Sequence, residues 1–320
     1  MSQDLLSCPE CQRRTPTARG ACMYCGATLP VAMIEAAPSQ RNIESFEQAF
    51  NTVLEPADFG DRLQMQARRG RSEAALASAL NLEAGEARAI LESGKRIPIA
   101  RSHTRQEADL IAALVRTCGV EAEVVADQDL RIKEELPRAK KITAEGEELH
   151  IEHSGGSASL PRSDIKLLVT GGLKSRRVDY TESVSSVRSQ SSGVVDSSEY
   201  FSGEMLLDLY SGTLERSFRV RSDAFDYSGL VERLSLLAEE NFRALVSRLQ
   251  ALAPGATLDQ DFGRVRHLLG RAWPERSRSE ARGLKRTGLS LRPVAQSSVT
   301  SDNRDQFDRY SRLMFISRLR

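Results

Sequence analysis

Four cysteines near the start of the chain have the spacing of a site that holds one metal ion. Cys8 and Cys11 form one Cys-x-x-Cys turn, and Cys22 and Cys25 form a second. Each turn can direct two thiolates at one point, and two facing turns supply the tetrahedral sulfur shell that Zn²⁺ prefers in closed structural sites. The spacing therefore predicts that these four residues bind a structural zinc ion.

Two alternatives use the same cysteines, namely a pair of disulfides or an iron–sulfur cluster. Disulfides require an oxidising compartment, and residues 1–7 have neither the basic start nor the apolar run of a secretory signal. We therefore favour zinc and a cytoplasmic location. A segment this short cannot bury enough apolar surface to fold alone, so metal binding would supply its folding energy.

The cysteine segment resembles a short zinc ribbon over residues 1–30. Residues 12–21 separate the two turns, which is enough chain for a short hairpin. Gly26 follows the second turn and has the freedom that a tight backbone turn needs, whereas Gln12 in the equivalent place after the first turn does not. The resemblance identifies a module with a structural metal and leaves the cellular role open.

The chain as a whole has the composition of an ordinary soluble protein. It has 320 residues, of which 40% are hydrophobic and 28% charged, and its apolar runs are far shorter than the roughly 18 residues of a membrane-spanning helix. Single cores stop growing near about 250 to 300 residues, so an α+β multidomain chain is expected. The predicted parts are a zinc ribbon (1–30), a linker with a helix at 43–54 (31–60), a small α/β sandwich (61–127), an antiparallel β-barrel capped by a helix (138–256) and a basic C-terminal tail (257–320).

The segment 61–127 has the order strand–helix–helix–strand–helix–strand, with a capping box at Thr104 and Glu107 opening the last helix. It resembles the C-terminal domain of the bacterial ribosomal stalk protein, most visibly in residues 81–92. That resemblance implies a module that binds protein partners; the glycine-rich turn of the stalk family is replaced here by Leu80-Asn81-Leu82, so factor binding is not carried over. The predicted elements are strands at 63–67, 97–100 and 121–125 and helices at 72–80, 83–92 and from 104.

Residues 138–256 read as short strands followed by one amphipathic helix at 229–251, an order that resembles a pleckstrin-homology-type barrel. The serine-rich stretch 181–199 is predicted to be a flexible loop. The three charges in 174–177 are typical of a solvated turn, so we do not expect phosphoinositide binding. The seven predicted strands are 141–144, 148–152, 157–160, 165–169, 177–180, 205–210 and 217–220.

The tail 257–320 is basic, with 14 Arg and Lys against 7 Asp and Glu. Such a tail could bind nucleic acid or dock on the acidic remainder of its own chain, and we favour docking. Within it, 275–286 and 290–301 are predicted to be turn-rich, and a terminal helix is expected from Asp302.

No catalytic set emerges from the remaining residues. His150 and His153 lie three apart on a predicted strand and so on opposite faces. The glycines of 170–175 are not followed by the Gly-Lys step or the helix of a phosphate-binding loop. Cys118 closes an amphipathic helix, where a buried thiol is expected.

The sequence thus predicts a non-enzymatic zinc-binding adaptor or scaffold that mediates protein–protein interactions in the bacterial cytoplasm. Its protein partner is unknown. The alternative is a nucleic-acid-binding regulator that uses the zinc ribbon and the Arg-rich tail. A third class, an unrecognised enzyme, would require a polar pocket with perturbed ionisable groups.

Overall fold

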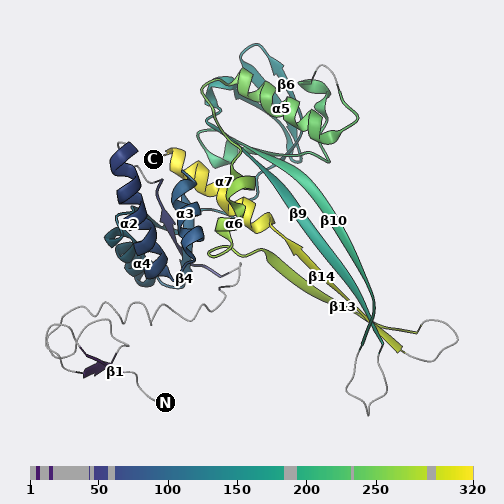
Figure 1. The fold of residues 1–320 in the computed structure, drawn as a ribbon. Coiled ribbons are helices and arrows are strands. Elements are labelled where there is room, and N and C mark those ends of the chain that lie inside the picture. Colours follow the sequence, from purple (N-terminus) through teal and green to yellow (C-terminus); the bar gives the residue numbers. More distant parts are fainter. Residues whose placement is uncertain are drawn as a thin grey trace. The chain divides into compact units, whose positions relative to one another are not determined.

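The computed structural model describes residues 5–7, 14–16, 43, 47–56, 62–183, 193–231, 234–286 and 293–319 of the 320 (Figure 1). The chain divides into two compact units, Met1–Asp129 and Leu130–Arg320. Both helices and sheets occur, which confirms the α+β fold class. None of the described helices is long and apolar enough to cross a membrane.

Two short strands precede the first folded core. Strands β1 (Leu5–Ser7) and β2 (Arg14–Pro16) pair antiparallel, with Leu5 opposite Pro16 and Ser7 opposite Arg14. In sequence, Cys8 and Cys11 fall between the two strands, but all four predicted zinc ligands lie outside the described residues.

The first unit contains a three-stranded sheet in the order β4-β3-β5, in which both outer strands run antiparallel to β3. Helix α4 packs on all three strands, and α2 packs on α3 and α4. The elements are β3 (Phe50–Leu54), α2 (Arg62–Leu80), α3 (Ala84–Glu92), β4 (Ile97–Ser102), α4 (Arg105–Thr117) and β5 (Ala122–Ala126).

Helix α4 begins and ends where its local sequence predicts. Thr104 accepts from the Glu107 amide, and the Glu107 carboxylate accepts from the Thr104 amide, so both members of the capping box are present. Ala108, Ala112 and Val115 are buried on one face. Gly119 follows the helix with φ +77°, a left-handed conformation that glycine adopts without steric cost.

The order of elements in this unit is the predicted one, but its first strand was placed wrongly. Residues 50–54, predicted as the end of a linker helix, form the central strand β3, and residues 63–67, predicted as a strand, belong to α2. Leu63 and Ala67 are four residues apart and so also fit one face of a helix, and Leu, Gln, Met and Ala are good helix formers. The β-branched Thr52 and Val53 suit the buried centre of a sheet.

The second unit is built on one nine-stranded mixed sheet. Its order is β13-β14-β9-β10-β11-β6-β7-β8, with β12 beside the start of β9; β11–β6 and β12–β9 are parallel pairs and the others antiparallel. In the described residues this path is open, so the predicted closed antiparallel barrel is wrong. The strands are β6 (Arg138–Glu145), β7 (Glu148–His153), β8 (Gly156–Pro161), β9 (Leu167–Ser183), β10 (Gly193–Tyr210), β11 (Phe218–Arg221), β12 (Thr257–Asp259), β13 (Arg276–Arg286) and β14 (Pro293–Asp302).

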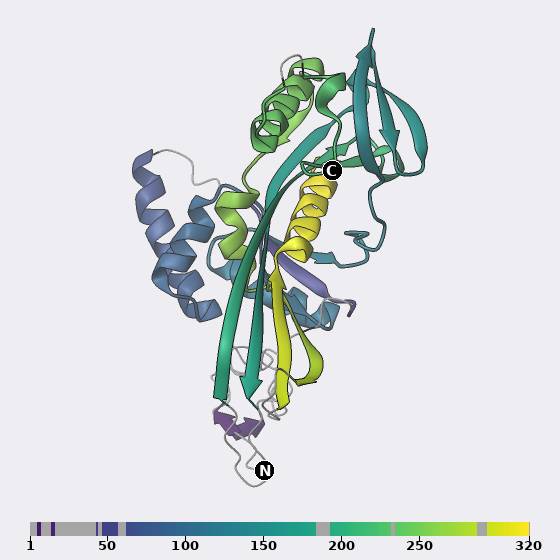
Figure 2. The same cartoon turned by 90° about the vertical axis from the view of Figure 1, so that its right-hand side faces the viewer.

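Helices cover both faces of this sheet (Figure 2). On one face Phe242 and Leu245 of α5 (Ala238–Leu252) belong to the same apolar core as Leu209 of β10. On the other face lie α6 (Phe262–Leu269) and α7 (Arg304–Leu319), where the Tyr210 ring stacks on Phe315 at 4.5 Å. Helix α5 starts nine residues later than predicted: 227–229 form a short 3-10 turn, and the described residues between this turn and Ala238 are not helical.

Gly171 of β9 allows α7 to approach the sheet closely. A Cβ atom at this position would lie 2.4 Å from two ring carbons of Phe307. Gly171→Ala should therefore lower the free energy of unfolding by about 1 to 3 kcal/mol, the usual cost of overpacking a core. Urea denaturation measures this, and Gly212→Ala, where a Cβ meets nothing within 4 Å, is the control and should change stability little. Equal effects of both variants would exclude the close approach as the cause.

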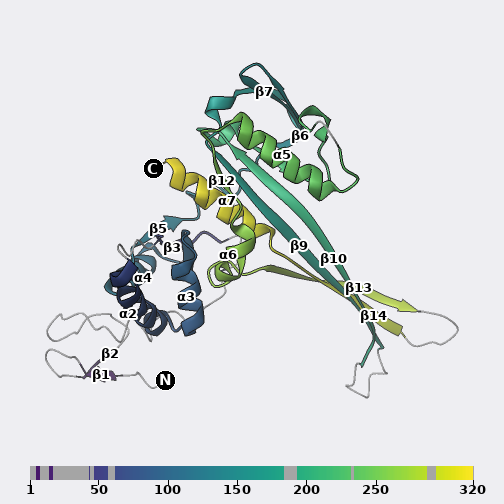
Figure 3. The same ribbon diagram turned by 45° about the horizontal axis from the view of Figure 1, so that its top comes forward.

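Four strands extend beyond this core as the β-arm, which we define as residues 174–183 of β9, 193–204 of β10, β13 and β14 (Figures 1 and 3). This corrects three predictions. The serine-rich loop 181–199 is largely strand, apart from 184–192 outside the described residues, and the turn-rich stretches 275–286 and 290–301 are mainly the strands β13 and β14. The segment 257–320 thus contributes the strands β12, β13 and β14 to the sheet.

Candidate functional site

The predicted zinc site remains a prediction, because Cys8, Cys11, Cys22 and Cys25 lie outside the described residues. Within the part of the chain that the structure describes, no group of three or more His, Cys, Asp or Glu side chains is arranged to hold a metal ion. The fifth cysteine, Cys118, is buried at the end of α4, as expected, and burial raises the pKa of its thiol. A thiol in that state is a poor nucleophile.

The two histidines of β7 are held in separate contacts. His150 Nε2 lies 3.6 Å from a Glu145 carboxylate oxygen, while His153 Nδ1 accepts from the Gly155 amide at 3.1 Å and its ring lies 5.3 Å from that of Phe218. Neither contact includes a nucleophile. Residues 170–175 lie inside β9, so no helix N-terminus follows them to bind a phosphate, which agrees with the sequence analysis.

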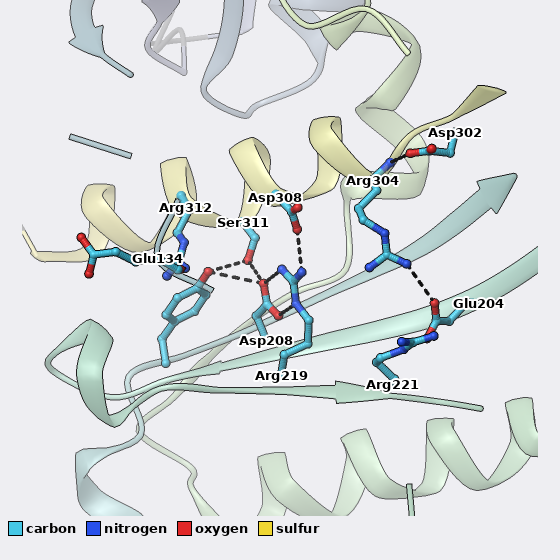
Figure 4. A network of polar contacts seen from close by, with 11 residues as sticks. Glu134, Glu204, Asp208, Arg219, Arg221, Asp302, Arg304, Asp308, Ser311 and Arg312 are labelled. Atoms are coloured by element: carbon cyan, nitrogen blue, oxygen red, sulfur yellow. Dashed lines mark hydrogen bonds and ion pairs between the residues drawn. The ribbon is translucent and has the colours of Figure 1, made fainter. Parts of the chain in front are cut away.

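The strongest polar constellation of the second unit centres on Asp208 and Arg219. These residues are directly opposite each other on β10 and β11. Arg219 Nε donates to Asp208 Oδ1 at 2.6 Å and its Nη2 donates to Oδ2 at 2.7 Å, which is the bidentate geometry of the strongest ion pairs (Figure 4). The Asp208 side chain is fully buried.

Helix α7 completes the constellation from above the sheet. Asp308 accepts from Arg219 Nη1 at 2.6 Å, and Ser311 Oγ donates to Asp208 Oδ2 at 2.6 Å. The Tyr210 hydroxyl lies 2.8 Å from Ser311 Oγ, and burial raises the pKa of Tyr210 so that it stays neutral. Burial likewise raises the pKa of Asp308, against the lowering effect of Arg219. Every member has a partner, which makes this a structural network that ties α7 to the sheet.

Several cations of the basic tail contact other residues inside this unit. Arg304 Nη2 donates to Glu204 at 3.3 Å, Arg276 lies 4.0 Å from Asp305, and Arg309 is buried. These contacts agree with a tail that docks on its own chain. They leave fewer arginines available for a polyanion.

Two exposed aromatic side chains lie on the β-arm. Tyr200 is 57% exposed and Phe201 is 74% exposed. As neighbours on β10 they point to opposite faces of the sheet. Strand β11 pairs with β10 only from Leu206 to Leu209, so among the described residues Ser197 to Gly203 have β9 as their one neighbouring strand. Two aromatic side chains therefore stand on an open sheet edge.

Hydrogen bonds near the base of the β-arm show which backbone groups face this edge. Lys174 lies opposite Gly203, and its amide donates to the Asn303 side chain on the β14 side of β9. The Met205 amide donates to the Ser222 hydroxyl, and the Met205 carbonyl accepts from the Ser222 amide. Gly203 and Met205 therefore turn their backbone groups away from β9. Since the direction alternates along a strand, the N–H and C=O groups of Phe201 and Glu199 face the open edge as well.

This edge was missed in the sequence because Tyr200 and Phe201 stand just after a serine-rich stretch that lacks alternation. Ser197 to Gly203 are all exposed, so no period-two pattern of buried residues marks this part of β10; the adjacent aromatic pair was the available signal. No family model, curated protein or solved structure matches this chain. Its function must therefore be inferred from its own residues.

Proposed function

We propose that this chain is a zinc-binding, non-enzymatic adaptor that docks a protein partner by adding a strand to the open edge of β10. The observation that carries the proposal is the exposed pair Tyr200 and Phe201 on a stretch of β10, Ser197 to Gly203, that has no second neighbouring strand among the described residues. The non-enzymatic character and the cytoplasmic location rest on the sequence, as does the zinc.

An open edge is a template for another chain, and proteins usually protect it with lysine, proline or a covering loop. From Gly193 to Glu204, β10 contains neither lysine nor arginine nor proline. An added strand would accept from and donate to the outward backbone groups of Glu199, Phe201 and Gly203. The added strand would also cover one aromatic ring on each face of the sheet. Buried aromatic side chains of this kind contribute much of the binding energy of protein interfaces.

The exposed side chains of this edge indicate the chemistry of the partner. Glu199 is already paired with Arg176, and Glu204 with Arg221 and Arg304, so these carboxylates are balanced within the fold. The partner strand is therefore expected to carry apolar residues that face Tyr200 and Phe201.

Site-specific photo-crosslinking in living cells tests this docking site. A photoreactive amino acid in place of Phe201 should give a discrete adduct with one protein. The same group in place of Leu236, which is fully exposed in the same unit but outside the β-arm, should not. Absence of an adduct at 201, or the same adduct at both positions, would refute docking at the edge.

With the crosslinked partner purified, Phe201→Ala should weaken binding by about thirtyfold, which corresponds to about 2 kcal/mol for loss of an aromatic anchor. Ser197→Pro should also weaken binding, because it removes an amide that faces the edge and leaves the bonds to β9 intact. Titration calorimetry measures both, with Leu236→Ala as the matched control. Unchanged affinity in Phe201→Ala would contradict the proposal.

A further inference from the structure

A cavity of about 230 Å³ opens in the second unit between β6, β11, α7 and the segment before β6. Half of the residues that line it are arginines, which is an unusual concentration of charge for a partly enclosed space. The lining residues are Ile132, Glu134, Glu135, Leu136, Arg138, Arg219, Arg221, Arg304, Asp308 and Arg312.

Three of these arginines have carboxylates of their own. Arg219 is held by Asp208 and Asp308, as described above. Arg221 and Arg304 both pair with Glu204. Their charges are balanced within the fold, so a ligand is not needed to neutralise them.

Arg312 differs from these three. Arg312 is only 5% exposed, and its Nη2 donates to the Glu134 carbonyl (Figure 4). Its Nη1 is buried without a hydrogen-bond partner, and no carboxylate lies within ion-pair distance among the described residues. The nearby Glu134 carboxylate accepts instead from Arg131 at 2.7 Å. A buried guanidinium group with a free donor and no counter-charge is costly.

Arg138 adds a second uncompensated charge to the same cavity. It lies directly beside Arg219 in the parallel pairing of β11 and β6, and its side chain forms no ion pair among the described residues. Arg219 is balanced by Asp208 and Asp308, so Arg138 is the member of this pair without a carboxylate of its own. An anion between Arg138 and Arg312 would balance the charges of these two arginines.

We propose that this cavity binds a small oxyanion, the phosphate or carboxylate group of a small molecule, with Arg138 and Arg312 as its ligands. The guanidinium fork matches both groups in shape and in hydrogen-bonding geometry. Glu135 lines the same cavity and opposes the anion by its charge. This site is independent of the β10 edge and gives the adaptor a means to respond to a metabolite.

Titration calorimetry of the full chain with inorganic phosphate, and separately with succinate, tests the site. We expect saturable binding of one ion per chain, and the tighter of the two ions identifies the class of natural ligand. Arg312→Gln and Arg138→Gln should each weaken binding by at least about tenfold, the effect of losing a charged hydrogen bond. Glu135→Gln should strengthen it.

Arg318→Gln is the matched control, because Arg318 is exposed in the last turn of α7 and does not line the cavity. It should bind as the unmodified chain does. Circular dichroism checks that each variant folds, and if Arg312→Gln does not fold, the more exposed Arg138→Gln decides the question alone. Absence of saturable binding to either ion, or an equal loss in Arg318→Gln, would overturn the proposal.

Discussion

Asp208→Ala should lower the free energy of unfolding of the second unit by about 3 to 5 kcal/mol, the usual effect of breaking a buried ion pair. The substitution leaves the guanidinium group of Arg219 without its bidentate partner and removes the acceptor of Ser311. Chemical denaturation followed by circular dichroism measures the change. A loss of this size would make the network a main support of the contact between α7 and the sheet.

An exposed ion pair of the same unit provides the comparison. Asp164 lies 3.3 Å from Arg216, with both side chains well exposed, so Asp164→Ala should cost less than about 1 kcal/mol. If Asp208→Ala cost no more than Asp164→Ala, the network around Arg219 would have no special role in stability.

Removal of zinc is the second change with a large expected effect. Structural zinc sites in short peptides have apparent binding free energies of about 10 to 16 kcal/mol, nearly all of which is folding energy. A strong chelator, or the double variant Cys8→Ser/Cys25→Ser, should therefore unfold residues 1–30 and leave the two compact units intact. Metal analysis should find one zinc ion per chain, and limited proteolysis should then cut first within residues 1–30.

Cys118→Ser is the control for this experiment, because Cys118 is buried at the end of α4 and should not bind zinc. Its metal content should equal that of the unmodified chain. A preparation that retains four free thiols in its first 30 residues and contains no zinc would contradict the zinc ribbon. Iron in place of zinc would favour the iron–sulfur alternative.

Local signals in the sequence predicted the elements whose ends they encode. The capping box at Thr104 and the short strands that became β6, β7 and β8 lie where the sequence placed them. Each of these elements is determined by residues within a few positions of it in the sequence. Such local patterns can be recognised without knowledge of the fold.

The elements that were predicted wrongly depend on contacts between segments that are distant in the sequence. The central strand β3 pairs with β4 and β5 from about 45 to 75 residues away, and its short sequence fits a helix almost as well. The described residues of the β-arm are mostly exposed or half-buried, with Ser298 as a buried exception, so no clear alternation marks these strands and their serine- and arginine-rich sequences looked like loops. The parallel pairs β11–β6 and β12–β9 likewise carry no local signature.

The candidate sites likewise differ in whether local sequence or distant contacts form them. The zinc ligands are predicted from spacing alone, whereas the Arg219 network joins β10, β11 and α7 across about 100 residues. Arg138 and Arg312 are 174 positions apart, and only the sheet order and the docking of α7 bring them to one cavity. The sequence indicated a basic tail but could not show which of its charges remain unbalanced.

Amide hydrogen exchange on the complex with the crosslinked partner tests the docking edge most directly. The amides of Glu199, Phe201 and Gly203 face away from β9, so they should exchange fast in the free chain and much more slowly in the complex. The amides of Tyr200 and Ser202, which face β9, should change little. Fast exchange of the three outward amides in a saturated complex would contradict strand addition at β10.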